Sequence, residues 1–287
     1  MKSSGRHCKL IPIILISLLL IVCALLVDSN LRLVTSEYGL FYSNLPAEFD
    51  GFRITVLSDI HAAEFGRNNK RLIKKVWGTA PDIIAITGDL IDGDKSPTTY
   101  EQLAIAGRLA SELIEIAPVY YITGNHDWNS GAARQLITIL EECGVAVLRN
   151  SYTLLEEGGV SIVLAGTDDP NGPADIVKPR AFVESIMAAE GSRFKILLEH
   201  RNNHLQLYSE LGVDLILSGH AHGGIVRLPF TDGLIGPSRD FLPTYTSGVY
   251  PMGTSNMVVS RGVGNHTGWP RFLNNPQVVV VELFSDN

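Results

Sequence analysis

From Phe52 onward, short apolar segments alternate with stretches of helical periodicity, and this alternation restricts the chain to an α/β fold. The apolar segments predict strands at Arg53–Leu57, Asp82–Thr87, Val119–Thr123, Val145–Leu148, Phe194–Leu198 and Asp214–Leu217. The stretches between them predict helices at Asn68–Gly78, Tyr100–Ile116, Gly131–Cys143, Pro179–Ala189 and Asn203–Leu211. Repeated strand-helix units of this kind build sheets with helices packed outside them.

Other segments are typical of antiparallel pairing. "YTLLEEGGVSIVLAG" predicts a hairpin that turns at Gly158 and Gly159, and late strands are expected at Met257–Ser260 and Val278–Phe284. Hairpins combined with strand-helix units predict a four-layer sandwich, in which two mixed β-sheets are flanked by helices. We expect this domain to occupy residues 52–287, after a connecting segment at 31–51 that includes a first strand in "SEYGLFYSNLP".

The N-terminal segment Leu10–Val27 contains no charged residue. A helix of about 18 residues spans roughly 27 Å, close to the hydrocarbon thickness of a bilayer. The tail before it is basic and the chain after it has mixed charge: Lys2, Arg6 and Lys9 against Asp28, Arg32 and Glu37. The positive-inside rule then predicts a cytoplasmic tail and single-pass anchor at residues 1–30 in the cell membrane, with the domain outside the cytoplasm. A cleaved signal peptide is the alternative.

The polar residues that follow the predicted strands are mostly of types that bind metal ions. Five motifs supply them: "SDIH", "TGDLID", "TGNHD", "LLEH" and "SGHAH". Their candidates are Asp59, His61, Asp89, Asp92, Asn125, His126, Asp127, His200, His220 and His222. Ligands bind at the carboxyl ends of strands in α/β sheets, and nitrogen and oxygen donors without thiolates suit catalytic Mn, Fe or Zn.

The spacing within the motifs indicates a shared site. In an extended strand exit, residues i and i+2 point the same way, so Asp59 with His61, and His220 with His222, are expected to face one site. Glycines at 88, 124 and 219 are expected to let the backbone turn sharply and approach the ions closely.

In their order, DxH, GDxxD, GNHD, a lone histidine and GHxH resemble the calcineurin-like metallophosphoesterase superfamily, over Phe52 to Leu283. The preceding apolar segment and "GHAHGG" are similar to its membrane-associated or exported bacterial branch. The resemblance implies two divalent metal ions (Mn, Fe or Zn) that share a bridging hydroxide as the nucleophile. It assigns Asp59, His61, Asp89 and His222 to one ion, and Asp89, Asn125, His200 and His220 to the other.

The resemblance also implies roles for the residues beside these ligands. His126 matches the histidine that stabilises the transition state or protonates the leaving oxygen, and Asp127 is expected to orient it. Asp92 is not counted as a ligand. The sequence "LLEHRNNH" departs from the family pattern after His200, and it leaves His204 as a rival ligand. Glu199 and Arg201 either reach the phosphate site or pair at the surface, and the second interpretation is favoured.

Residues outside the motifs are weaker candidates. Arg239, Arg261 and His266 are considered for contacts with a phosphate. The Gly/Pro-rich segment from Leu228 to Asn256 is too long for a simple turn and is interpreted as a lid or a substrate wall. Its aromatic side chains are expected to pack within it rather than to bind lipid: Phe230, Phe241, Tyr245 and Tyr250.

The predicted activity is hydrolysis of a phosphomonoester, phosphodiester or pyrophosphate, because the same metal centre handles all three bonds. The anchor and the resemblance favour a phosphorylated small molecule or a lipid-linked substrate near the membrane. A net charge of -7 argues against a nucleic-acid polymer as partner, since no dense basic surface is available. The alternative function is a non-catalytic, metal-stabilised module that binds a wall or lipid phosphate.

Overall fold

Two six-stranded sheets organise the domain in the computed structural model, which describes residues 4–92, 98–173, 177–229, 231–236, 240–265 and 268–286, with side chains from residue 11 onward. The first sheet has the order β1 (Val34–Tyr42), β12 (Gln277–Ser285), β2 (Phe52–Leu57), β3 (Ile83–Ile86), β4 (Val119–Tyr121) and β5 (Ala146–Val147). The second has the order β10 (Gly248–Met252), β11 (Ser255–Val259), β9 (Leu215–Ser218), β8 (Lys195–Leu198), β7 (Val160–Gly166) and β6 (Ser151–Glu157).

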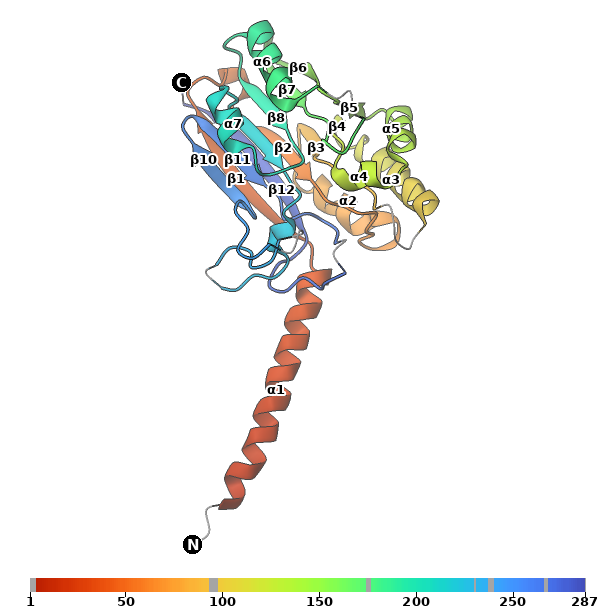
Figure 1. Cartoon of the computed structure of the whole chain (residues 1–287), viewed down its shortest axis with the longest axis vertical. Helices are drawn as coiled ribbons and strands as arrows, with labels where there is room; N and C mark the ends of the chain where they lie inside the picture. The colour runs from red at the N-terminus through yellow and green to blue at the C-terminus, as the bar shows by residue number, and fades with distance from the viewer. Residues whose placement is uncertain are drawn as a thin grey trace.

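Helix α1 precedes the domain, and other helices cover both of its outer faces (Figure 1). They are α1 (Ser4–Leu31), α2 (Lys70–Trp77), α3 (Thr99–Leu113), α4 (Asn125–Asn129), α5 (Ala133–Glu142), α6 (Pro179–Glu190) and α7 (Leu205–Glu210). Three single 3-10 turns are η1 (Ala47–Phe49), η2 (Arg67–Asn69) and η3 (His222–Gly224).

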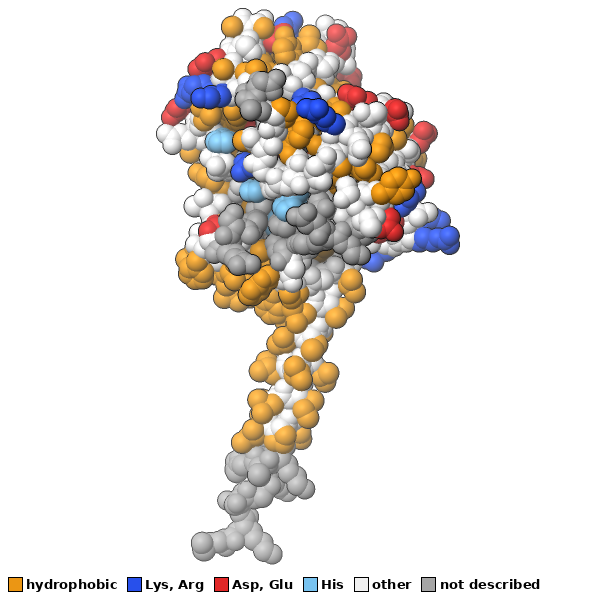
Figure 2. All heavy atoms as spheres, turned by 45° about the vertical axis from the view of Figure 1, so that its right-hand side comes forward, with side chains coloured by type: hydrophobic (Ala, Val, Ile, Leu, Met, Phe, Trp, Pro, Cys, Tyr) orange, Lys and Arg blue, Asp and Glu red, His pale blue; other side chains and the backbone are white. Residues whose placement is uncertain are grey.

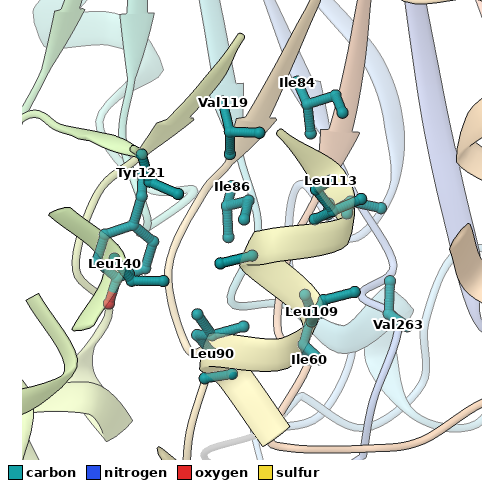
Figure 3. Packing of buried hydrophobic residues seen from close by; sticks show 14 of the residues in the cluster. Ile60, Ile84, Ile86, Leu90, Leu109, Leu113, Val119, Tyr121, Leu140 and Val263 are labelled. Atoms are coloured by element: carbon teal, nitrogen blue, oxygen red, sulfur yellow. The ribbon is translucent and has the colours of Figure 1, made fainter. Parts of the chain in front are cut away.

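Strand β3 shows how the layers are held together. Its four residues are all buried, because a central parallel strand is covered on both faces. Ile84 and Ile86 belong to the apolar cluster beneath α3 and α5, where Leu109 and Leu113 pack against them (Figure 3). Ile83 and its neighbour Ala85 belong to the cluster between the two sheets. Helices α6 and α7 cover the outer face of the second sheet, so the predicted four-layer sandwich is confirmed.

The strand directions bring the polar motifs to one edge. Strands β2, β3 and β4 are parallel in the first sheet, and β7, β8 and β9 are parallel in the second. Four motifs follow β2, β3, β8 and β9, and the fifth follows β4. All five therefore leave the sandwich at the carboxyl ends of parallel strands, where α/β sheets bind ligands.

The first strand expected in the connecting segment is present as β1, and it pairs with β12 over nine residues, so that part of the segment belongs to the first sheet. Other local structure was not foreseen. Helix α4 begins at Asn125, inside "TGNHD", where five residues are too few to show a helical period. Asp127 accepts the backbone N–H of Gly124 at 2.8 Å and so stabilises the first turn of this helix.

The expectation for the aromatic residues of Leu228–Asn256 is partly wrong. Tyr245 and Tyr250 contact each other edge to face at 5.0 Å, as expected of packing within the segment. Phe241 instead exposes most of its side chain to solvent. Phe230 lies outside the described residues. The segment also contains strand β10, which pairs with β11 at the border of the second sheet.

Helix α1 projects away from the sandwich (Figure 1). Its stretch Ile11–Leu31 is 21 residues long and apolar enough to cross a membrane, and the domain buries none of its most apolar 18-residue window, although Ser29 near its end is buried. A signal sequence has the same length and composition, so this observation supports a membrane-directed segment without fixing its fate.

We expect Leu113→Ala to lower the free energy of unfolding by about 2–5 kcal/mol, because Leu113 is fully buried between α3 and the first sheet. Glu112→Ala, at the exposed neighbouring position of the same helix, is the matched control and is expected to change stability by less than about 0.5 kcal/mol. Urea midpoints of the full-length protein measure both, and equal midpoints would contradict the packing described for α3.

Candidate metal centre

Three overlapping groups of ligand-type side chains meet at the carboxyl edge; one joins His61 to Asp92 and His126, and the other two consist of predicted ligands. The first consists of Asp59, His61 and His222, whose nearest side-chain atoms lie within 4.8 Å of one another. Nε2 of His61 is 3.3 Å from Nε2 of His222, which is 3.5 Å from Oδ1 of Asp59. These residues come from the loops after β2 and β9, so the site is assembled between the two sheets.

The second group consists of Asp89, His200 and His220. Nε2 of His200 lies 3.2 Å from Nδ1 of His220 and 3.1 Å from Oδ1 of Asn125. Nδ1 of His200 lies 2.8 Å from the carbonyl oxygen of Thr87, which fixes the orientation of the ring.

Asp89 connects the two groups. Its Oδ2 atom is 3.2 Å from Nε2 of His200 and 3.9 Å from Nε2 of His61. Its Oδ1 atom accepts the backbone N–H of His126 at 2.7 Å. The structure thus brings all seven predicted ligands together, with Asp89 positioned to be shared.

The backbone explanation for the paired residues is wrong. Asp59 and His61 have φ values of 49° and 47°, and His220 and His222 have 66° and 47°, so neither pair is extended. Residues in this left-handed region are uncommon outside glycine and concentrate at functional sites. As a result, His220 turns toward His200 while His222 turns toward His61, and the two histidines enter different groups.

At the glycines of the motifs the backbone passes close to the predicted ligands. A Cβ atom on Gly219 would overlap Oγ of Ser58 and Oδ2 of Asp59, and one on Gly124 would overlap Oδ1 and the backbone nitrogen of Asp89. Only glycine leaves room for these carboxylates at the centre of the site.

Burial and crowding perturb the ionisable groups. Burial raises the pKa of Asp59 to about 6. Burial opposes ionisation of Asp89 too, but the neighbouring His200 and His61 lower the pKa of Asp89 far below its usual range. Burial would lower the pKa of His200, yet Asp89 raises it to about 10. Burial, and next the charge on His200, lower the pKa of His220 to about 3. A proton on His200 therefore balances the charge of Asp89, in the place that a cation bound by both side chains would take.

The site fits divalent cations. Oδ2 of Asp89 is buried, and its nearest donor is Nε2 of His200 at 3.2 Å, in an ion pair that lacks good hydrogen-bond geometry. A buried carboxylate oxygen needs compensating positive charge, and a cation held between Asp89 and the histidines would supply it. Ligands that bind a cation at roughly 2.0–2.2 Å lie about 3.0–3.6 Å apart. The separations of 3.1, 3.2 and 3.3 Å between donor atoms agree with this spacing.

His126 and Asp127 have different surroundings from those expected. Nδ1 of His126 lies 3.0 Å from Oδ1 of Asp92, so Asp92 orients the ring. The carboxylate of Asp127 is fully buried and accepts the backbone N–H groups of residues 89, 90, 91 and 124 at 2.8–3.0 Å. The prediction that Asp127 orients His126 is therefore wrong, because its oxygens hold the backbone of the Asp89 loop.

The predicted surface pairing of Glu199 is also wrong. Glu199 is only 3% exposed, and it accepts hydrogen bonds from Thr167 and, at 2.8 Å, from the hydroxyl of Tyr208. Nδ1 of His204 lies 3.1 Å from Glu199, so His204 turns away from the cluster and is not a rival of His200. Arg201 contacts Asp169 at 2.8 and 3.1 Å instead of Glu199.

Two residues that hold His222 were missed. Arg271 is fully buried, burial lowers its pKa to about 10, and its Nη1 and Nη2 atoms lie 3.5 Å from the carbonyl oxygen and Nδ1 of His222. Asn274 donates to the same carbonyl oxygen at 2.8 Å. Both follow the last motif by about 50 residues, and no local pattern in "RFLNNP" indicates this contact.

Of the weaker candidates for phosphate contact, Arg261 is the one that the described residues include. Arg261 is partly buried beside Gly223, with its backbone N–H on Gln277. Arg239 and His266 lie outside the described residues.

Comparisons with known proteins define the class. The calcineurin-like phosphoesterase family profile matches residues 52–224. The metallophosphoesterase YkuE of Bacillus subtilis is 32% identical over 257 residues, which cover 88% of this chain and 86% of that protein. The chain therefore belongs to the calcineurin-like phosphoesterase family and is a metal-dependent phosphoesterase.

Two further similarities agree with this assignment. The phosphodiesterase YaeI of Escherichia coli is 28% identical over 236 residues, covering 81% of this chain and 82% of that protein. A dimetal phosphatase from Danio rerio has a similar fold, with a TM-score of 0.50 and 10% identity over 74% of this chain and 88% of its own. The second similarity supports the fold alone.

We expect Gly219→Ala to weaken metal binding by about 10–100-fold, the range found when residues that orient a ligand are changed. The added methyl group would displace Asp59, whereas Gly78→Ala meets its nearest atoms at 3.5 Å and is the matched control. Metal analysis after titration with a chelator measures the loss. Unchanged affinity in Gly219→Ala would contradict the position of Asp59 in the site.

Proposed function

We propose that this protein hydrolyses phosphate esters at a dinuclear centre, with Asp89 shared between the two ions. Asp59, His61 and His222 complete one ligand set, and Asn125, His200 and His220 complete the other. The observation that carries the proposal is the position of the buried Oδ2 atom of Asp89, 3.2 Å from Nε2 of His200 and 3.9 Å from Nε2 of His61, between the two ligand sets.

When bound, two divalent ions polarise the phosphoryl group and lower the pKa of water, so no serine or cysteine nucleophile is needed. The protein's own contribution is to place donors before the substrate arrives. Asp127 fixes the backbone of residues 89–91, and Arg271 with Asn274 fixes His222. The ligands are thus held by buried contacts in the absence of substrate.

His126 is the group that we assign to proton transfer. Asp92 holds Nδ1, so Nε2 is the nitrogen that is directed to deliver a proton to the leaving oxygen. The carboxylate of Asp92 raises the pKa of His126 against the opposing effect of burial, which favours the protonated ring that a general acid requires.

A cleft beside the proposed centre provides room for substrate. Its volume is about 330 Å³. His220, Ala221 and residues 201–203 line one part of the cleft, and Asp240, Pro243 and Thr244 line another. Arg201 lines it while bound to Asp169, so its positive charge is held in place beside the site. The cleft admits a phosphomonoester, a phosphodiester or a pyrophosphate with a moderately sized group attached.

We further propose that α1 is retained as a single-pass anchor, with the domain outside the cytoplasm. The basic tail and the apolar stretch support this orientation through the positive-inside rule. A protein of Danio rerio described as a transmembrane protein with a metallophosphoesterase domain is 28% identical over 76% of this chain. Substrates near the membrane are therefore favoured.

We expect His126→Gln to keep its metal and to lose about 10²–10⁴-fold in kcat, the contribution typical of general acid catalysis. A panel of nitrophenyl monoesters and diesters, nucleotides and pyrophosphates, with Mn²⁺ supplied, measures the rate, and elemental analysis measures the metal. His204→Gln is the matched control, because this histidine contacts Glu199 outside the cluster, and it is expected to keep metal and rate.

The outcomes separate the two functions considered. A metal-loaded wild-type protein that hydrolyses no ester in the panel would support a non-catalytic phosphate-binding module. Equal rates for the wild type and His126→Gln would instead refute the role of His126 and leave the metal centre standing.

We expect the full-length protein to remain in the membrane fraction at its uncleaved mass, and its domain to be digested by protease added to intact spheroplasts. The charge bias across α1 is the reason for this orientation. A shortened, soluble form would establish a signal peptide, and a domain protected from protease would refute the outward orientation.

A further inference from the structure

Four exposed apolar side chains lie near the edge of the domain from which α1 departs. Leu228 is 45% exposed, Phe241 74%, Leu242 59% and Trp269 57%. Orange side chains gather on the underside of the domain around the upper end of the helix, and histidine side chains reach the surface above them (Figure 2). We call these four residues the apolar rim. Exposed clusters of large apolar side chains mark interaction sites.

The sheet topology places α1 and the metal centre at the same edge. β1 runs parallel to β12, β12 runs antiparallel to β2, and β2 is parallel to β3 and β4. The beginning of β1 therefore lies where β2, β3 and β4 end. Since α1 stops at Leu31 and β1 starts at Val34, the helix leaves the domain beside the loops that carry the proposed ligands.

The end of α1 is fixed to the domain by hydrogen bonds. The side chain of Asn30 donates to the carbonyl oxygen of Arg271 at 2.9 Å and accepts its N–H at 3.0 Å. The hydroxyl of Ser29 accepts the N–H of Leu273 at 2.8 Å. The charge-free run Leu10–Val27 spans about 27 Å, close to the hydrocarbon thickness, and it ends directly before these contacts. A bilayer around this run would place the polar contacts at its surface.

A short ladder of backbone contacts connects the end of α1 to the rest of the apolar rim. Phe272 forms a β-bridge with Val226. The backbone N–H of Leu234 donates to the carbonyl oxygen of Val226 at 2.8 Å, and the N–H of Leu242 donates to the carbonyl oxygen of Leu234 at 2.9 Å. Neighbouring strands lie about 4.8 Å apart, so Leu242 lies roughly 14 Å from Phe272 along the ladder. Trp269 precedes Arg271 by two residues. The rim therefore extends sideways from the end of the helix.

The same segment forms one wall of the substrate cleft. Asp240, Pro243 and Thr244 line the cleft opposite His220, and Phe241 and Leu242 stand between them in the sequence. One face of this turn thus borders the proposed metal centre while its apolar side chains are open to the surroundings.

We propose that the apolar rim rests in the interface of the bilayer that α1 crosses, so that the cleft opens at the membrane surface and accepts phosphate esters that carry an apolar chain. This inference rests on the proposed function for the anchor and the hydrolysis. Apolar and aromatic side chains at the headgroup level bind the interface, and a fixed helix confines them to it. The phosphate of an amphiphile lies at that same level, next to the cleft.

Fluorescence quenching in nanodiscs with dibrominated lipid tests the contact. The full-length protein carries Trp77→Phe and Trp269→Phe, two exposed positions, and receives a tryptophan at Phe241 or, as matched control, at Glu157. Trp128 is kept in every protein, and the emission of the parent without an added tryptophan is subtracted. Glu157 ends β6 at the hairpin turn, on the edge opposite the end of β7. We expect the tryptophan at 241 to lose about half of its emission, since interfacial groups enter roughly 5–10 Å, and the one at 157 to lose none. Equal quenching at the two positions would overturn the proposal.

Substrate preference gives an independent measurement. The panel of esters first identifies the type of phosphate bond that the protein hydrolyses. A hexadecyl and an ethyl ester of that type are then compared in nanodiscs, for the wild type and for a Phe241→Ser, Leu242→Ser double variant. We expect the ratio of kcat/KM for the hexadecyl to the ethyl ester to fall at least about tenfold in the variant, because two apolar contacts with the interface are lost. An unchanged ratio would refute the amphiphilic substrate. Quenching at 241 in a protein without hydrolysis would refute the proposed function alone.

Discussion

The rest of the site is arranged around the buried carboxylate of Asp89 and its contacts with histidines from both sheets. This carboxylate lies between His61 and His200, and its loop is held by the carboxylate of Asp127 through three backbone N–H groups. An acid in this position is costly unless positive charge compensates it. The fold therefore has to deliver imidazoles from both sheets, and a close backbone approach at Gly124, to the same point.

The sandwich meets this requirement through the direction of its strands. Parallel strands in both sheets end at one edge, so five loops converge there although they are separated by up to about 160 residues. Because β1 starts at this edge, the membrane-directed helix departs there as well. One topological constraint thus accounts for the metal centre, the cleft beside His220 and the position of the apolar rim.

Sequence reasoning succeeded where residue type and order carry the information. The alternation of apolar segments and helices predicted the layers, and the motifs predicted every member of the cluster from Asp59 to His222. It failed where the partner of a side chain had to be known. Asp127 holds backbone instead of His126, and Glu199 is buried against Tyr208, because these contacts depend on how neighbouring loops pack. Arg271 was missed for the same reason.

The sequence by itself determined the class of fold, the chemical nature of the ligand set and the presence of one apolar segment before the domain. Only the tertiary structure decided that left-handed turns separate the rings of His220 and His222, that Asp92 orients His126, and that Phe241 is exposed near the end of α1. Strand periodicity and ligand type are local properties of the chain. Left-handed backbone turns, shared ligands and exposed surfaces depend on distances between segments that are remote in sequence, and packing alone sets those distances.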